Sequence, residues 1–304
     1  MSQTLCLHHN DADGRASAAI VRRFYGPETL CYEMNYGDPV PWEQVQQADR
    51  VVMVDFSLPL EDTQRLAEGR EFIWIDHHKS SLETLGPEAD RRGWPGLRNT
   101  EEAACVLTWR FFFPDQPVPR AVVLIGDRDI WRWAEEDTGP FNEGLYREPD
   151  TSPCNDALWQ PLLDDDPEAL QRLIERGRVL REARLQDLQR AVERRAFPVL
   201  FEGHRTLAIN HPGSGDLGAI IRGLGYTIAY TYVDGVQNGE LRTFVTLYSD
   251  QIDVSEIARR FGGGGHAGAA GFSFPRGVAP FPPGSQWALL DPEQEHPPES
   301  EHQP

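Results

Sequence analysis

The chain has 304 residues, of which 39% are hydrophobic and 25% are charged, as in ordinary globular proteins. No apolar run approaches the roughly 20 residues that span a bilayer, and no basic segment precedes an apolar stretch near residue 1. Neither a membrane span nor a secretory leader is therefore expected. The formal net charge of −19 disfavours a binder of long duplex nucleic acid, which needs many Lys and Arg contacts to phosphates.

The cysteines are scattered, and no two of them have the Cys-x-x-Cys spacing of a thiolate metal site. The four positions are Cys6, Cys31, Cys105 and Cys154. A disulfide framework and a thiolate zinc site are therefore not expected. A reducing cytoplasm is the expected compartment.

The first half of the chain alternates short apolar runs with stretches of helical spacing. Residues 16–24 have the apolar spacing of a helix. Runs rich in β-branched and aromatic residues predict four buried parallel strands, at residues 5–9, 50–55, 71–76 and 121–127. Each run ends in Asp or His. Because the carboxyl ends of parallel strands lie at one edge of a sheet, a ligand site is expected there.

The second half has a different pattern. Leucines and other apolar residues recur at three to seven positions over 167–196, which predicts a long amphipathic helix that ends before Pro198 and connects two domains. Strand-like runs follow at 206–210, 226–233 and 243–248. The last two are separated by turn residues that predict a hairpin, and a short helix is expected at 254–261. After Pro275 the Pro-rich, acidic chain is expected to be disordered or loosely attached, and dispensable.

Acidic and imidazole side chains gather at the ends of the predicted strands. They are His9, Asp11, Asp13, Asp55, Asp76, His77, His78, Asp127 and Asp129. Any one of these acids can be explained as a helix cap or a polar turn. Four consecutive strand ends of this kind are not explained by capping, because converging carboxylates repel one another unless cations lie among them. Asp and His without thiolates favour Mn²⁺ or Mg²⁺.

The order of these motifs resembles the DHH/DHHA1 phosphoesterase superfamily. The motifs are His-x-Asp-x-Asp-Gly, Val-Asp-x-Ser, Asp-His-His and Gly-Asp, followed by a glycine-rich stretch at 262–271, and the resemblance covers residues 5–274. It is strongest to the short-oligoribonuclease (nano-RNase) type, because His9 stands two residues before Asp11. The implied fold is α/β, with an N-terminal parallel-sheet DHH domain and a smaller α/β DHHA1 domain joined by a long helix. The expected site lies in the cleft between them.

The resemblance implies boundaries and a ligand set. The DHH domain would span 1–155, the helical connector 156–198, the DHHA1 domain 199–275 and the tail 276–304. Two divalent cations, Mn²⁺ or else Mg²⁺, would be held by His9, Asp11 and Asp55 on one side and by Asp13, Asp55, His77 and Asp127 on the other. His78 would face the substrate phosphate, and Asp76 would orient an imidazole. His8 in place of His9, and Asp129 in place of Asp127, are the open alternatives.

The glycine-rich stretch has two interpretations. A run of glycines is often a flexible linker. Here the run follows a predicted helix and leads into small residues, so its exposed N–H groups can also form an anion-binding nest. With the family resemblance, the second interpretation is favoured. The implied substrate-binding residues are Gly263, Gly264, Gly265 and His266.

The expected activity is metal-dependent hydrolysis of short oligonucleotides to mononucleotides, with attack by a hydroxide shared between two metals. A 3′-phosphoadenosine 5′-phosphate phosphatase or another small-nucleotide phosphoesterase is the alternative, and a non-catalytic nucleotide-binding protein is the third hypothesis. The expected partners are the nucleotide substrate and, as a further option, a second copy of the chain. No membrane and no long duplex is expected as a partner.

Overall fold

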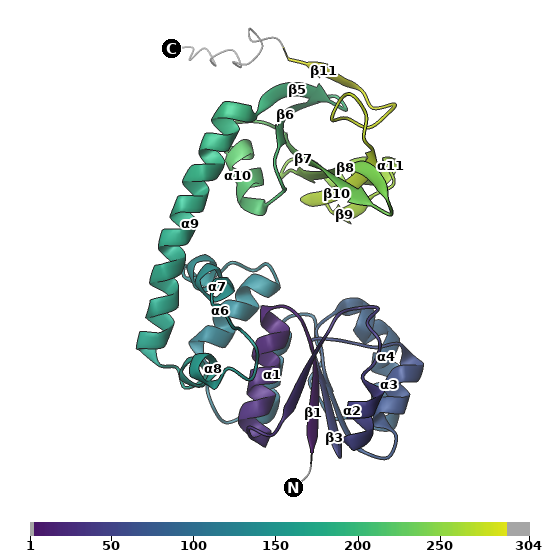
Figure 1. The fold of residues 1–304 in the computed structure, drawn as a ribbon, viewed down its shortest axis with the longest axis vertical. Coiled ribbons are helices and arrows are strands. Elements are labelled where there is room, and N and C mark those ends of the chain that lie inside the picture. Colours follow the sequence, from purple (N-terminus) through teal and green to yellow (C-terminus); the bar gives the residue numbers. More distant parts are fainter. Residues whose placement is uncertain (1–2, 291–304) are drawn as a thin grey trace, which may run out of the picture. The chain divides into compact units, whose positions relative to one another are not determined.

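The computed structural model describes residues 3–290, which form two compact units. The first unit extends to Arg181 and the second begins at Glu182, within one long helix, α9 (Pro167–Arg195) (Figure 1). This helix confirms the one predicted over 167–196. None of the helices in the described part of the chain combines the length and the apolar composition needed to cross a membrane.

The first unit is built on a parallel sheet with the strand order β2-β1-β3-β4. Its strands are β1 (Thr4–His9), β2 (Leu30–Met34), β3 (Arg50–Val54) and β4 (Glu71–Ile75). Alternate residues of each strand face opposite sides, so Cys6 and Val52 pack in one core while Leu5 and Val51 pack in another. Both faces are therefore buried, as expected for a parallel sheet.

Helices cover both faces of this sheet. One face packs against α2 (Trp42–Gln47), α3 (Leu60–Ala67) and α4 (Lys79–Arg92). The other packs against α1 (Ala12–Tyr25), α5 (Ala104–Phe112), α6 (Arg120–Asp129), α7 (Thr138–Tyr146), α8 (Asp156–Leu163) and the start of α9. The carboxyl ends of β1, β3 and β4 thus open between the two helical layers.

One predicted strand of this sheet is wrong, and one strand of the sheet is missing from the prediction. Residues 121–127 belong to helix α6 and not to a strand. This helix is so deeply buried that apolar residues occur on most of its sides, and a short helix of that kind cannot be distinguished from a buried strand by periodicity. The fourth strand is instead β2, at an edge of the sheet. Its partly exposed sequence, Leu-Cys-Tyr-Glu-Met, lacks the apolar run that marks the central strands.

The second unit is built on a mixed seven-stranded sheet with the order β11-β5-β6-β7-β8-β10-β9. Its strands are β5 (Phe197–Phe201), β6 (His204–Asn210), β7 (Ile228–Gln237), β8 (Glu240–Tyr248), β9 (Gly264–His266), β10 (Ala269–Pro275) and β11 (Trp287–Leu289). Helix α10 (Gly215–Gly223) packs on one face and α11 (Val254–Arg260) on the other. The predicted hairpin is confirmed as β7–β8. Its turn residues Asn238 and Gly239 have φ of 53° and 80°, as a type I′ turn requires.

The expectation of a loosely attached segment after Pro275 is wrong for residues 276–290. Strand β11 pairs with β5, and Phe281 is buried among the aromatic rings of Phe201 and Tyr230. The Pro-rich composition predicts a loosely attached segment, but this segment contributes one aromatic side chain, Phe281, to the core. The remainder of the predicted tail, 291–304, lies outside the described residues.

Candidate metal centre

The end of β1 and the start of α1 bring the first two polar side chains together. His9 is the last residue of β1, and Asp11 caps α1 by accepting the Gly14 N–H at 2.9 Å. The His9 Nδ1 and Asp11 Oδ2 atoms are 2.7 Å apart. A Cβ atom on Gly14 would lie 2.4 Å from the His9 carbonyl oxygen, so only glycine permits this tight strand-to-helix turn.

Asp13, in the first turn of α1, is buried and firmly held. Its two carboxylate oxygens accept the backbone N–H groups of Ala104 and Cys105, at 2.9 and 2.7 Å. These two residues begin helix α5, whose N-terminus favours a negative charge. The predicted ligand Asp13 therefore has a fixed position, and its Oδ2 lies 3.7 Å from Nε2 of His77, in the segment after β4.

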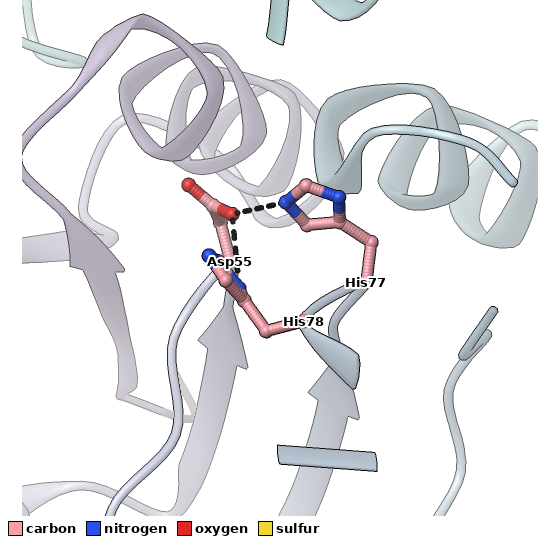
Figure 2. Close-up of side chains that lie close together, drawn as sticks. All are labelled: Asp55, His77 and His78. Atoms are coloured by element: carbon pink, nitrogen blue, oxygen red, sulfur yellow. Dashed lines mark ion pairs between the residues drawn. The ribbon is translucent and has the colours of Figure 1, made fainter. Parts of the chain in front are cut away.

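Asp55 is at the centre of the cluster. It follows β3 directly with a φ of 53°, a left-handed conformation that is uncommon for residues other than glycine. The residue is 1% exposed, and among the described residues neither carboxylate oxygen has a hydrogen-bond partner. Its Oδ1 is 3.2 Å from His77 Nε2 and 3.8 Å from His78 Nδ1. Figure 2 draws both contacts as dashed lines from the Asp55 carboxylate. Its Oδ2 is 4.0 Å from His9 Nδ1.

The segment after β4 supplies the two other imidazoles. Asp76 accepts the backbone N–H groups of His77 and His78 at 2.7 and 3.2 Å, and the same oxygen lies 2.8 Å from His78 Nδ1. The geometry places Asp76 where it orients the His78 ring rather than in the central cluster. This is the position that the sequence interpretation assigns to it.

The structure brings Asp129, and not Asp127, to the cluster. The Asp129 Oδ2 atom is 3.4 Å from His77 Nε2. Asp127 points elsewhere: its carboxylate accepts the N–H groups of Ala134 and Glu135 and the hydroxyl of Thr138. The resemblance implies a ligand at the Gly-Asp position, and the predicted strand end favours Asp127 over Asp129. On helix α6 the two aspartates project differently, and the second one reaches the site.

His9, and not His8, lies at the cluster. His8 is 1% exposed, and its Nδ1 is 2.8 Å from the His9 carbonyl oxygen. Burial lowers the pKa of His8, which favours a neutral ring. The alternation of side chains along β1 separates the two histidines onto opposite sides of the strand.

Three groups of side chains have ligand atoms within 4.8 Å of one another, close enough to hold a metal ion. They are His9, Asp11 and Asp55; Asp55, His77 and His78; and Asp13, His77 and Asp129. The first two share Asp55, and the last two share His77. All the predicted metal ligands except Asp127 are in these groups.

The carboxyl groups repel one another strongly in the absence of cations. Burial, together with the charges of Asp13, Asp11 and Asp129, raises the pKa of Asp55 well above its ordinary range. Burial and neighbouring Asp13 raise the pKa of Asp129 to about 7. Unpartnered oxygens on Asp55 and this accumulation of acids fit divalent cations, which would stabilise all the carboxylates in their charged form.

The three histidines of the cluster differ in the direction in which their pKa is shifted. Hydrogen bonding to Asp11 raises the pKa of His9, and hydrogen bonding to Asp76 raises the pKa of His78. Burial lowers the pKa of His77, which suits a neutral metal ligand. His78 is thus best suited to carry a proton, and it is also the most exposed of the three, at 35% of its side chain.

Tyr36 is a neighbour of the cluster that the sequence interpretation missed. Its ring centroid lies 5.9 Å from that of His9 and 6.3 Å from that of His78, and 5.0 Å from that of Phe56. Tyr36 is 56% exposed. Tyr36 follows β2, the strand that the apolar pattern did not reveal, so no sequence signal placed this loop beside the end of β1.

The glycine-rich stretch of the second unit is an ordered hairpin and not a linker. Gly264–His266 forms β9, which pairs with β10 at the sheet edge. A Cβ on Gly263 would lie 2.0 Å from the Gly271 carbonyl oxygen, and Gly265 has a φ of 140° with the Ala269 oxygen 2.6 Å from its Cβ position. Gly264 has open space around it, and His266 is exposed.

Comparison with known proteins gives two distant sequence relatives. No family model matches the chain. It is 26% identical to the uncharacterized protein R106 of Acanthamoeba polyphaga mimivirus over 254 residues, which cover 79% of this chain and 57% of the viral protein. It is 25% identical to the oligoribonuclease NrnB of Bacillus subtilis over 298 residues, which cover 87% of this chain and 71% of NrnB. The chain therefore spans little more than half the length of its viral relative.

A solved structure extends the comparison to the fold. The pGpG-specific phosphodiesterase PggH of Vibrio cholerae matches with a TM-score of 0.54 and 14% sequence identity, over 90% of this chain and 93% of PggH. At this identity the match concerns the fold alone. The chain therefore shares its fold with the phosphodiesterase PggH, and the oligoribonuclease NrnB is its distant sequence relative, in agreement with the resemblance that the motifs predict.

Proposed function

We propose that this protein is a phosphodiesterase that uses two divalent cations, Mn²⁺ or Mg²⁺, to hydrolyse short oligonucleotides to mononucleotides. The observation that carries the proposal is Asp55. Its carboxylate is buried, has no hydrogen-bond partner among the described residues, and lies between the His9 side and the His77 side of the cluster. A buried carboxylate in that state is costly unless cations neutralise it on both sides.

The ligands divide between two cations. His9, Asp11 and Asp55 would hold one, and Asp13, Asp55, His77 and Asp129 would hold the other, with Asp55 shared. When bound there, a pair of cations neutralises charge on the phosphate oxygens and makes a water molecule acidic enough to be hydroxide near neutral pH. Because Asp13 is fixed by α5 and Asp11 by α1, these ligands need little reorganisation to bind.

His78 has the position and the charge to bind the substrate phosphate. Asp76 holds its Nδ1, which leaves Nε2 free to donate a hydrogen bond, and the same contact raises the pKa of the ring. A protonated imidazole with one nitrogen anchored can donate a charge-assisted hydrogen bond to a phosphate oxygen. Asp76 acts through His78 and is a positioning residue.

The proposed substrate class rests on three supports. NrnB is an oligoribonuclease and PggH is specific for the dinucleotide pGpG, so a relative and a structural neighbour both act on short chains. The net charge of −19 opposes binding along a long phosphate backbone. The second unit offers an ordered glycine hairpin whose open Gly264 and exposed His266 can contact a terminal phosphate or nucleotide.

The test is a hydrolysis panel with Mn²⁺, Mg²⁺ or excess chelator. The substrates are RNA and DNA of two to about ten nucleotides, 3′-phosphoadenosine 5′-phosphate, and pyrophosphate. We expect metal-dependent release of mononucleotides from the shortest RNA, abolished by Asp55→Asn. An Asp115→Asn variant, which alters an exposed acid outside the cluster, should retain activity. Activity that persists in chelator or in Asp55→Asn would refute the metal assignment. Exclusive turnover of the bisphosphate nucleotide would refute the substrate assignment.

A further inference from the structure

Two exposed tryptophans follow the last acid of the metal centre. Trp131 is 73% exposed and Trp133 is 44% exposed, and they begin the loop directly after α6. Their ring centroids lie 5.7 Å apart with the planes at 64°. Among the described residues, the ring of each makes its only aromatic contact with the other. Exposed aromatic rings that lie together are a candidate binding surface.

We propose that Trp131 and Trp133 form a stacking platform for a nucleobase of the substrate, adjacent to the Asp129 side of the metal centre. The proposal rests on the proposed function and extends it, since it assigns residues that recognise the base and not the phosphate. Aromatic side chains bind bases of any sequence by stacking, because every base has a π face. That mode of binding suits an enzyme that cleaves short oligonucleotides without a long basic groove.

The backbone of this segment is held in an unusual conformation. Trp131 and Trp133 have φ of 55° and 52°, in the left-handed region that bulky residues rarely adopt. Backbone conformations of this kind persist only where the surrounding structure enforces them, and they are frequent at ligand-binding sites. A sequence under no constraint to place rings here would be expected to have Gly or Asn at such positions.

Asp127 enforces that conformation. Its carbonyl oxygen accepts the N–H groups of Arg132 and Trp133 at 3.0 and 3.3 Å. Its carboxylate accepts the N–H groups of Ala134 and Glu135, at 3.0 and 3.2 Å, and the Thr138 hydroxyl. The aspartate that the sequence interpretation assigned to the metal is thus a positioning residue for the tryptophan loop.

Trp131 and Trp133 are close in sequence to Asp129, a residue of the metal centre. Trp131 is two residues from Asp129, so their Cα atoms are separated by at most about 7 Å. The Asp129 carboxylate is in turn 3.4 Å from His77. The proposal places the phosphate of a single nucleotide at the metal centre and its base on the platform.

The test separates base recognition from catalysis by measuring binding. Adenosine 5′-monophosphate and ribose 5-phosphate, which lacks the base, are titrated into Mn²⁺-loaded protein while tryptophan fluorescence is recorded. We expect quenching by the nucleotide alone. The variants are Trp131→Asn and Trp133→Asn, because asparagine tolerates the left-handed backbone and removes only the ring. Trp131→Phe should restore part of the affinity. Tyr146→Ala, which removes another exposed ring of the same unit, is the matched control.

Loss of the platform should weaken nucleotide binding roughly 5- to 150-fold, the range for one stacked base. The affinity for ribose 5-phosphate should be unchanged. It is measured by competition with the nucleotide in wild-type protein and by calorimetry in the variants. Equal effects on both ligands, or no effect of either Asn variant, would overturn the proposal and leave the pair as a contact surface for a protein. Failure of the proposed function is distinguishable, because it would be an absence of hydrolysis in wild-type protein whatever the fluorescence does.

Discussion

Asp127 and Asp129 are only two residues apart in the chain, but their isosteric substitutions should have opposite effects on the stability of the metal-free protein. Asp127→Asn removes the charge from a carboxylate that accepts two backbone N–H groups and a hydroxyl. Hydrogen bonds to charged groups contribute about 1.5–3 kcal/mol each. We therefore expect Asp127→Asn to lower the free energy of unfolding by about 2 kcal/mol or more.

Asp129→Asn should instead stabilise the metal-free protein at alkaline pH. Burial and Asp13 raise the pKa of Asp129 from 3.8 to about 7, so the folded protein holds a proton there that the unfolded chain releases. The associated stability is present at low pH and is lost as the pH rises through about 7. Above that pH the ionised carboxylate costs up to about 4 kcal/mol, at about 1.4 kcal/mol per pKa unit, and Asp129→Asn avoids this cost.

Bound Mn²⁺ should reverse the order of stability of the two variants. A ligand that binds only the folded state stabilises it, so Mn²⁺ should raise the stability of wild type and of Asp127→Asn by similar amounts. It should have a smaller effect on Asp129→Asn, which lacks one ligand. The assay is urea unfolding at pH 5 and pH 8, in chelator and in Mn²⁺. The reasoning is refuted if Asp129→Asn destabilises the metal-free protein at pH 8, or if Asp127→Asn loses the response to Mn²⁺.

The remaining predictions concern other parts of the site and fold. His78→Gln should lower kcat for a dinucleotide at least 10-fold while calorimetric Mn²⁺ binding at the His9–Asp11 side is retained; unchanged turnover would remove His78 from phosphate binding. Phe281→Ala should cost about 3–5 kcal/mol of stability, as for other buried rings, and a change below 1 kcal/mol in urea unfolding would mean that 276–290 is dispensable after all. Gly263→Ala should disrupt the β9–β10 hairpin and weaken dinucleotide binding, whereas Gly223→Ala, at the end of α10 with open space around it, should not; equal binding by the two variants would contradict the close approach of Gly263 to Gly271.

Most of the site could be predicted from the sequence because the chemistry there is local. His9, Asp11 and Asp13 share a short strand-to-helix turn, and Asp76 to His78 are consecutive. A correct prediction of β1, β3 and β4 was therefore enough to predict that these side chains lie together. The long helix α9 and the Asn238–Gly239 hairpin have equally strong local signals. Periodicity and turn chemistry indicate these elements without knowledge of any tertiary contact.

The wrong or missing predictions concern elements whose structure depends on tertiary packing. Helix α6 is apolar because it is buried, and its pattern does not reveal whether Asp127 or Asp129 faces the cluster. The β2 strand is at a sheet edge, so its sequence lacks the apolar run of a buried strand. Without that strand, the position of Tyr36 beside the site could not be predicted. The core position of Phe281 depends on a pairing of β11 with β5 across more than 80 residues, as in the Trp287–Phe201 pair. No local pattern encodes contacts of that range.

The most direct test of the account is to locate Mn²⁺ by anomalous diffraction from crystals of the metal-loaded protein. Two peaks about 3.5–4 Å apart are predicted, as in two-metal hydrolytic sites, with the Asp55 carboxylate between them. Asp129 should coordinate one of them, and the Asp127 carboxylate should remain on the loop at Ala134. A single peak, or two peaks that Asp55 does not bridge, would contradict the shared carboxylate on which the account depends.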